Sequence, residues 1–328
     1  MVDQVLQSRR YFWTIVPPAV PILLLYIGLG IFIVPPFLSA GNLISIFYSA
    51  TVLVPAALGM QLLLTLGRFD LSTGATAALA GMVAAIELLS SNSVLVAVIL
   101  SIAVGVASGA LAGYLVAYVK IDPLIATLAT MGIGRSLSLI SNGGGVIAGL
   151  PPSFGILATA RILGLPVLTL LACAAIILAI FLTRHAVLFR RLYAAGSNSA
   201  AATHSGINVK ALTATGYILA GVGAALTGLI QSTRTLSASP QIFESLAIDT
   251  IAACIIGGSS LAGGRGSMLG AALGLIAVSS TDNIVIMLDI PVYWRSLAVG
   301  ILLLSAVIWS PSITYRPKTP RKLKGDLS

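Results

Sequence analysis

The chain has 328 residues, of which 58% are hydrophobic and only 8% are charged, and its mean hydropathy is +1.05. Soluble domains carry about 25% charged residues, and the long apolar stretches of this chain recur along its whole length instead of enclosing one core. This composition excludes a soluble protein. The net charge of +9 does not indicate nucleic-acid binding, because the basic residues lie in short connectors between apolar stretches.

Ten apolar segments predict an all-α integral membrane protein, since each is near the roughly 20 residues that cross a bilayer. They cover residues 14–34, 43–66, 72–90, 94–119, 124–141, 163–183, 211–231, 245–262, 267–288 and 294–310. The first segment is too long for the apolar region of a secretory signal, so we expect it to be retained. The predicted organisation is a cytoplasmic N-terminus over 1–13, a transmembrane domain over 14–310 and a basic cytoplasmic tail over 311–328.

The distribution of basic residues predicts the orientation, because cytoplasmic loops collect Lys and Arg. With ten helices and both termini in the cytoplasm, fourteen of the eighteen basic residues lie inside. These are Arg9, Arg10, Arg68, Lys120, Arg184, Arg190, Arg191, Lys210, Arg265, Arg316, Lys318, Arg321, Lys322 and Lys324. Arg161, Arg234 and Arg295 fall outside, and Arg135 lies in or near the fifth segment. A change of one in the helix count would scatter this pattern.

The longest cytoplasmic connector runs over residues 184–210 and is the best candidate for a docking surface, because it is polar and rich in small residues. Glycines also recur at spacing four, at Gly105, Gly109 and Gly113 and again at Gly266, Gly270 and Gly274. Such ridges let helices approach closely, and we expect them to serve packing within the chain more than a subunit interface.

Catalytic and metal-binding signatures are missing from the sequence. It contains no G-x-x-x-x-G-K-[ST] phosphate loop and no G-x-S-x-G elbow, and its two histidines lack a partner at metal-ligand spacing. Asp70, Asp122, Asp249 and Glu87 fall near the ends of predicted helices, which disfavours a proton- or sodium-coupled carrier with a chain of buried acids. We therefore predict that the chain is not an enzyme and holds no metal.

Two polar turns between apolar segments are predicted to be structural. The first contains Arg68, Asp70 and Ser72, with Asp70 as the N-cap of the following helix and Ser72 in its first turn. A pairing of Arg68 with Asp70 that steadies a moving loop is the alternative. The second turn contains Gly257, Gly258, Gly263 and Gly264, and its glycines permit a tight reversal on the basic inner face.

Four motifs between residues 43 and 310 resemble, in order, the permease subunits of ribose, xylose, arabinose and galactose ABC importers, in the branched-chain amino acid and sugar permease superfamily. They are GRFDLSTG at 67–74, IDPLIATLATMGIGRSLSLISNGG at 121–144, YAAGSNSAAATHSGI at 193–207 and IDTIAACIIGGSSLAGGRGSMLGAALG at 248–274. The first departs from the family's GGIDLSVG at Arg68 and Phe69, which leaves the solute and the choice of homodimer or heterodimer open.

The resemblance implies a permease with an inverted repeat of five helices in the bacterial inner membrane. Its implied partners are ATP-binding cassette subunits that bind ATP and Mg, a second permease copy or paralogue, membrane lipid, and a periplasmic or lipid-anchored solute-binding protein. This chain itself would hold no cofactor. The residues that would couple to the ATPase are Tyr193, Ala195, Gly196, Asn198, Ala200, Ala201, Thr203 and Gly206.

The implied function is inward movement of a monosaccharide or sugar-like compound by alternating access driven by the partner ATPases. Candidate pathway residues are Gln61, Asn142, Ser279 and Asn283. Autoinducer-2, a nucleoside or a polyol is an alternative solute within the same family. An ion-coupled secondary carrier and a facilitator channel are alternatives of other classes, and neither would depend on ATPase and binding subunits.

Overall fold

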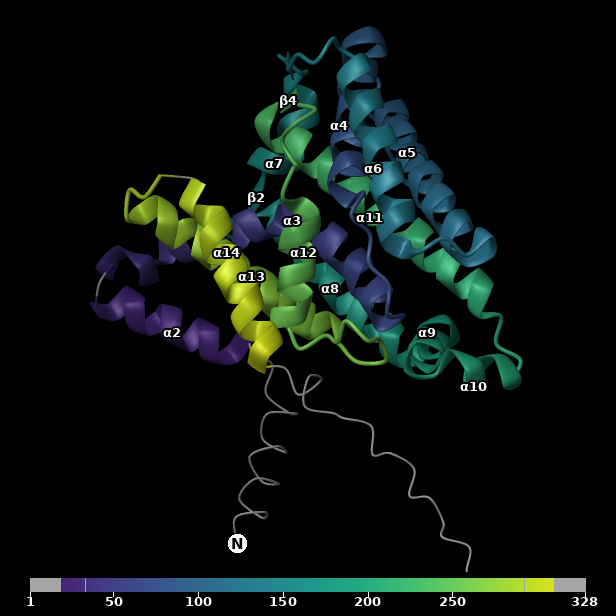
Figure 1. Ribbon diagram of the computed structural model, residues 1–328. Coiled ribbons are helices and arrows are strands. Elements are labelled where there is room, and N and C mark those ends of the chain that lie inside the picture. The colour runs from purple at the N-terminus through teal and green to yellow at the C-terminus, as the bar shows by residue number, and fades with distance from the viewer. Residues whose placement is uncertain (1–18, 33, 292, 310–328) are drawn as a thin grey trace, which may run out of the picture.

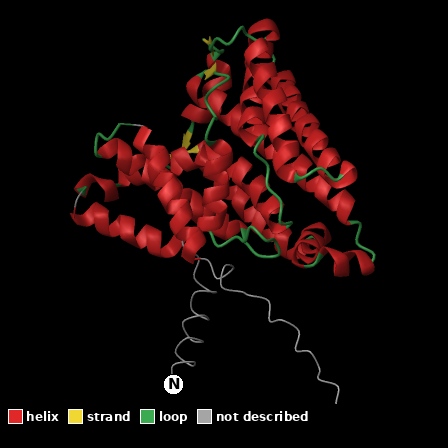
Figure 2. Cartoon of the chain, viewed as in Figure 1, coloured by secondary structure: helices red, strands yellow, loops and turns green. Residues whose placement is uncertain are grey.

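The computed structural model describes residues 19–32, 34–291 and 293–309, and this part of the chain is mostly helical (Figure 2). The predicted cytoplasmic segments 1–13 and 311–328 lie outside the described residues, as do the first residues of the first apolar segment. Short loops and four two-residue strands connect the helices.

A helix lies in each of the ten predicted apolar segments. They are α2 (Ala19–Phe32), α3 (Ala40–Thr65), α4 (Thr73–Ser91), α5 (Val94–Tyr114) with the π-helical turn η2 (Leu115–Val119), α6 (Pro123–Ile140), α8 (Val167–His185), α11 (Val209–Thr235), α12 (Leu246–Ile256), α13 (Met268–Met287) and α14 (Tyr293–Trp309). Within the described residues, seven helices are long and apolar enough to cross a membrane, counting α5 and η2 as one. The chain is therefore a multi-pass membrane protein, and the number of ten crossings stays a prediction.

Short elements fill the connectors. They are η1 (Pro35–Leu38), β1 (Ile147–Ala148), η3 (Pro152–Gly155), α7 (Ile156–Thr159), β2 (Arg161–Ile162), β3 (Leu165–Pro166), α9 (Val187–Ser197), α10 (Ser199–His204) and β4 (Ser237–Ala238). β1 and β4 pair antiparallel with Ile147 opposite Ala238, which joins the connector after α6 to the chain after α11. β2 and β3 form a second antiparallel pair.

Helix α11 is the centre of one half of the molecule and packs against α3, α4 and α5 (Figure 1). A Cβ atom built at Gly105 would lie 2.4 Å from the carbonyl oxygen of Gly221, and one at Gly109 would lie 2.3 Å from that of Tyr217. The backbones of α5 and α11 therefore touch. The expectation that this glycine ridge serves packing within the chain is confirmed, and Gly270 and Gly274 approach the backbone of α12 in the same way.

The other half is built from α12, α13 and α14, with α2 beside α13. Helix α3 contacts both halves, because it packs against α11 on one side and against α12 and α13 on the other. Figure 1 shows α4, α5, α6 and α11 on one side and α2, α13 and α14 on the opposite side. This arrangement leaves a cavity between the two halves, beside the middle of α3.

Candidate functional site: an outer polar cavity and an inner docking surface

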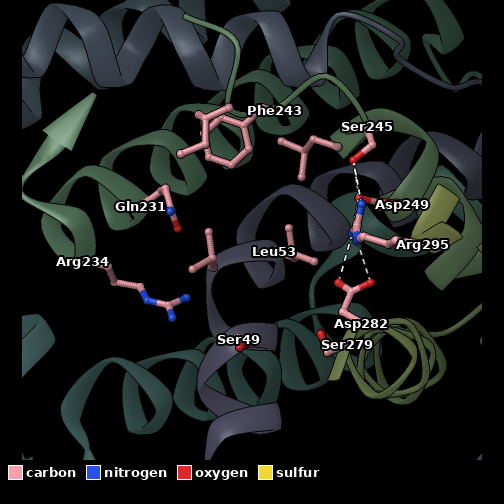
Figure 3. Close-up of a pocket in the computed structure, with 13 residues that line it drawn as sticks. Ser49, Leu53, Gln231, Arg234, Phe243, Ser245, Asp249, Ser279, Asp282 and Arg295 are labelled. Carbon is pink, nitrogen blue, oxygen red and sulfur yellow. Dashed lines mark hydrogen bonds and ion pairs between the residues drawn. The ribbon is translucent and has the colours of Figure 1, made fainter. Parts of the chain in front are cut away.

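A cavity of about 230 Å³ lies between the two halves. Its walls come from α3, the last turns of α11, the segment before α12, the first turns of α12 and α14, and the last turns of α13. The lining residues are Ser49, Val52, Leu53, Gln231, Arg234, Ile242, Phe243, Ser245, Leu246, Asp249, Ser279, Asp282 and Arg295 (Figure 3). In the predicted orientation, the ends of α11, α12, α13 and α14 that line the cavity face the outside of the cell.

One wall of the cavity is an ion-pair network centred on Arg295. Its guanidinium donates to both carboxylate oxygens of Asp282, from Nε at 2.7 Å and from Nη2 at 3.0 Å. Nη2 also donates to Asp249 at 2.9 Å, and Nη1 donates to the hydroxyl of Ser245 at 3.0 Å. Ser245 in turn donates to Asp249 at 2.8 Å. Because each carboxylate is paired with Arg295, this wall ties α12, α13 and α14 together.

The opposite wall carries Arg234 and Gln231 on α11 (Figure 3). The guanidinium carbon of Arg234 lies 4.0 Å from the centroid of the Tyr48 ring, and Nη1 is 3.4 Å from the carbonyl oxygen of Tyr48. Among the described residues, no carboxylate forms an ion pair with Arg234. A guanidinium stacked on an aromatic ring keeps its edge free to donate hydrogen bonds.

The two walls give the cavity matched polar groups and no net charge, because Arg234 and Arg295 balance Asp249 and Asp282. Between them, Leu53, Ile242 and Phe243 supply apolar surface. Such a mixture of apolar surface and a few placed donors and acceptors is typical of a site for a small polar molecule. No group of three or more His, Cys, Asp or Glu side chains within the described part of the chain could hold a metal ion.

The C-terminal end of α3 forms a junction in which backbones meet directly. A Cβ atom at Gly196 of α9 would lie 1.8 Å from the carbonyl oxygen of Thr65, the last residue of α3. The amide of Gly264 donates to the same Thr65 oxygen at 2.8 Å. Gly263 and Gly264 have φ of +87° and +72°, a backbone region that favours glycine.

Side chains fasten α9 to this junction. The hydroxyl of Tyr193 donates to the carbonyl oxygen of Gly266 at 2.8 Å, and Leu192 and Ala195 are buried in a cluster with Leu62 and Met268. Burial raises the pKa of Tyr193 above its ordinary value, so the phenol stays a donor. These contacts fasten helix α9 to the end of α3 and to the turn before α13.

Helix α10 follows α9 and exposes most of its surface at the edge of the molecule (Figure 1). Asn198 caps it by accepting a hydrogen bond from the amide of Ala201 at 3.0 Å. Ala200, Ala201 and Thr203 are exposed, whereas Ala202 is buried against α9 and α11. The result is a small, uncharged helical surface held by a rigid support.

Comparison with known proteins identifies the family. The family model described as the permease component of the branched-chain amino acid transport system matches residues 42–307. The ribose import permease protein RbsC of Bacillus subtilis (strain 168) is 36% identical over 306 residues, which cover 92% of this chain and 95% of that protein. The chain belongs to this permease family. The resemblance seen in the four motifs is thereby confirmed.

Two further relatives are similar over most of the chain. The ribose import permease protein RbsC of Escherichia coli (strain K12) is 33% identical over 94% of this chain and 98% of its own length. The autoinducer 2 import system permease protein LsrC of Escherichia coli O157:H7 is 30% identical over 88% of this chain and 84% of its own length. No solved structure matches the permease.

Of the four predicted pathway residues, Ser279 lines the outer cavity and the other three lie elsewhere. Gln61 is buried on α3 and hydrogen-bonds Ser259 of the turn before α13, near the inner junction. Asn283 exchanges hydrogen bonds of 2.9 and 2.8 Å with Asn42, which fixes α13 to the start of α3. Asn142 lies in the turn after α6 and donates to the carbonyl oxygen of Gly145 at 3.3 Å.

The predicted coupling residues divide into two groups. Tyr193, Ala195 and Gly196 lie on α9 against the rest of the permease, whereas Asn198, Ala200, Ala201 and Thr203 belong to α10 and its cap. Gly206, with φ of +78°, lies in the turn that leads to α11. In the glycine turn, Gly257 lets α12 touch α13, since a Cβ atom there would lie 2.2 Å from the carbonyl oxygen of Gly270, and Gly258 has φ of +92°.

The turn before α4 differs from the prediction in one respect. Helix α4 begins at Thr73 with Ser72 at the N-cap position, so the prediction that Asp70 is the N-cap was wrong. Asp70 instead accepts hydrogen bonds from the amide of Ser72 at 2.7 Å and from its hydroxyl at 2.6 Å. Asp70 as a whole is 1% exposed, and no ion pair with Arg68 forms within the described residues.

Sequence reasoning missed the charged residues of the outer cavity. Asp249 was placed near a helix end, and Asp282, inside the ninth apolar segment, was not considered. A usable signal was present, because a charged residue within an apolar segment is costly and usually functional. Asp282 lies near the end of α13 and Arg295 near the start of α14, so two helices that follow each other in the chain can pair there.

Proposed function

We propose that this chain is the transmembrane permease subunit of an ABC importer in a bacterial inner membrane. It moves a small polar solute, a monosaccharide or sugar-like compound, inward by alternating access driven by ATP hydrolysis in separate subunits, without covalent chemistry of its own. The observation that carries the proposal is the presence, in a member of this family, of a polar cavity beside the middle of α3 and of an exposed helix, α10, whose support contacts the last residue of α3.

The cavity supports a neutral, hydroxyl-bearing solute. The carboxylates of Asp249 and Asp282 are held by Arg295 and keep lone pairs as acceptors, and Arg234 on the opposite wall balances the remaining negative charge. Arg234 and Gln231 on the opposite wall supply donors, and Phe243 supplies an aromatic surface. The relatives are named for import of ribose and autoinducer 2, which agrees with this chemistry. A nucleoside or a polyol is the alternative cargo.

The α10 surface supports docking of the ATPase. It carries small exposed residues that allow close approach, and its support, α9, contacts the end of α3 and the glycine turn at the backbone level. A push on α10 therefore reaches α3, which also lines the outer cavity. This continuity is the basis for assigning coupling to α9 and α10.

The face of α6 supports a second permease copy in the assembly. Arg135 lies within this membrane-length helix and pairs with Glu244 at 2.7 Å, but the two side chains are 54% and 61% exposed. Charged groups facing lipid hydrocarbon are costly, so this face is expected to meet protein or a water-filled path. A second permease beside α6 would cover Arg135 and Glu244 with protein, or with water enclosed between the two copies.

The packing of the helices supports an inverted repeat of two groups of five. In the first group, α4 packs on α5 and α6, and in the second α12 packs on α13 and α14. α11 contacts α3, α4 and α5, and in the matching way α3 contacts α11, α12 and α13. This correspondence fits ten crossings with both termini in the cytoplasm.

An ion-coupled carrier is the alternative from another class, and the cavity weighs against it. A coupling carboxylate must gain and lose its ion during transport, whereas Asp249 and Asp282 are both bound by the same guanidinium. A carrier of this kind would also work without ATPase subunits.

The proposal is tested by purifying the tagged permease in mild detergent and identifying its partners by mass spectrometry. Recovery of an ATP-binding subunit is the expected result, and the co-encoded binding protein is then screened with sugars by its melting shift. Recovery of the chain alone, together with solute flux in liposomes without ATP, would overturn the proposal.

A further inference from the structure

A second cavity, of about 450 Å³, lies at the inner end of the molecule and has no part in the solute path described above. It is lined by Arg68 before α4, by Val116, Ala117, Lys120, Ile121, Asp122 and Pro123 between η2 and α6, and by Val209, Lys210 and Thr213 at the start of α11. Three separate segments of the chain thus meet around it.

Positive charge dominates this cavity. Arg68, Lys120 and Lys210 are exposed, and none of the three forms an ion pair within the described residues. The one acid, Asp122, already accepts a hydrogen bond from the amide of Leu124 at 2.9 Å as the cap of α6. The first turn of α11 adds the positive end of a 27-residue helix. The cavity therefore favours an anionic group.

The surface beside the cavity is shaped for hydrocarbon. Leu111, Tyr114 and Tyr118 recur on one face of α5 and η2 and are exposed, and the two tyrosine rings stack at 5.8 Å. Val119, next to Lys120, is also exposed. Tyrosines are typical of the boundary between headgroups and acyl chains, and basic pockets between helices on the cytoplasmic side suit anionic headgroups.

We propose that this basic cavity binds the phosphate headgroup of an anionic phospholipid of the inner leaflet, with the acyl chains along the Leu111, Tyr114 and Tyr118 face. Inner-leaflet placement rests on the orientation proposed above, whereas the binding itself does not. The lipid would bridge the loops before α4 and α6 to the start of α11, which directly follows the docking helix α10. The bound lipid would thus fix these loops and the start of α11 at the level of the inner membrane surface.

The size of the effect follows from the charges. Each Lys or Arg near an anionic surface contributes about fivefold to binding, so three cations opposed by Asp122 give about 25-fold preference for phosphatidylglycerol over phosphatidylcholine. The preference is measured by native mass spectrometry of the purified permease in mixed micelles. A rise of the melting midpoint with phosphatidylglycerol, and none with phosphatidylcholine, is the companion result.

Variants separate this site from general charge effects. Lys120→Gln is expected to lower the preference about fivefold, and Arg68→Gln with Lys120→Gln and Lys210→Gln to abolish it. Lys120→Arg keeps the positive charge and should therefore keep the preference for phosphatidylglycerol. Arg184→Gln removes an exposed basic residue of α8 that does not line the cavity, and it should leave the preference unchanged.

Three results would overturn the proposal. A full melting shift with inorganic phosphate alone would assign the cavity to a soluble anion. An unchanged lipid preference in the triple variant would place the lipid elsewhere. If the triple variant kept the lipid preference but no longer co-purified with the ATPase, the cavity would instead dock an acidic segment of the ATPase. A failure of the importer proposal is separate, because it appears in the partners recovered and leaves lipid binding intact.

Discussion

The middle and the inner end of α3 have opposite surroundings. Beside the middle of the helix, long charged side chains and Phe243 surround a cavity of about 230 Å³ and meet through side-chain hydrogen bonds. At the inner end, glycines let the backbones of α9, α3 and the turn before α13 touch, so there is no room for a methyl group. A solute site needs space and adjustable polar groups, whereas a part that transmits force needs rigid contact.

Gly196→Ala is the change expected to do the greatest damage, because the new methyl would meet the carbonyl oxygen of Thr65 at 1.8 Å. Overpacking against backbone that cannot shift is expected to lower the free energy of unfolding by about 3 kcal/mol. The measurement is a denaturation curve in detergent. Gly132→Ala is the control, since nothing lies within 4 Å of a Cβ there and the helix should tolerate or gain from alanine. Equal stability of the two variants would refute the rigid inner junction.

Arg295→Gln breaks the outer wall and leaves Asp249 and Asp282 without a counter-charge. Loss of one partner from a buried pair costs about 3–5 kcal/mol, and we expect about 2–3 kcal/mol here because the Arg295 side chain is 22% exposed. Solute uptake should fall as well. The control is Arg135→Gln, which breaks the exposed pair with Glu244. In the same denaturation measurement, its free energy of unfolding should fall by less than about 0.5 kcal/mol. A cost for Arg295→Gln as small as this would show that the network does not hold the cavity wall.

Ala200→Asp tests the docking surface without touching the rigid junction. Position 200 is exposed on α10, so stability should change by less than about 0.5 kcal/mol. A buried charge at the interface should reduce ATP-driven uptake about tenfold while the ATPase keeps hydrolysing ATP. Ala200→Ser adds no charge and should stay coupled. Normal coupling of Ala200→Asp would remove the assignment of α10 to docking.

The smallest expected effect is a pH dependence at Asp70, in the inner turn. Burial raises the pKa of Asp70 above its ordinary 3.8, against the opposing hydrogen bonds from Ser72. The folded state therefore binds the proton more tightly than the unfolded state, and this contribution to stability is lost as the pH rises through the raised pKa. Asp70→Asn should gain stability relative to the parent as the pH rises from about 4 to about 7. A constant difference over that range would show that Asp70 does not titrate there.

The sequence predicted the glycine ridges better than the outer cavity, for a physical reason. Glycines at a fixed spacing indicate close backbone approach and form a pattern that is local in the chain. The small residues of the 184–210 connector were expected to meet the ATPase, which stays a prediction, and the contact of Gly196 with Thr65 was not expected. The outer cavity assembles residues from five helices, and only their spatial arrangement shows that Arg234 stands opposite Arg295. Asn283 and Gln61 were chosen for polarity alone, and the structure uses their amides to join helices.

Helix positions were largely predictable because apolar length is a strong signal in a membrane protein. The predicted segment over 245–262 is a mixture in the structure, since α12 ends at Ile256 and an extended glycine turn follows. Composition could not separate the two, as both are apolar and rich in small residues. The connector after α6 likewise contains β1, which pairs with a strand about 90 residues later in the chain, a contact that no local pattern shows.

Solute uptake into proteoliposomes is the most direct test of the account. The permease is reconstituted with its co-purified ATPase and binding protein, and uptake of ribose and related sugars is measured with ATP, without ATP, and with an imposed proton or sodium gradient. The account predicts uptake that requires ATP, falls in Arg295→Gln and loses its coupling in Ala200→Asp. Uptake by the chain alone, driven by an ion gradient, would contradict it.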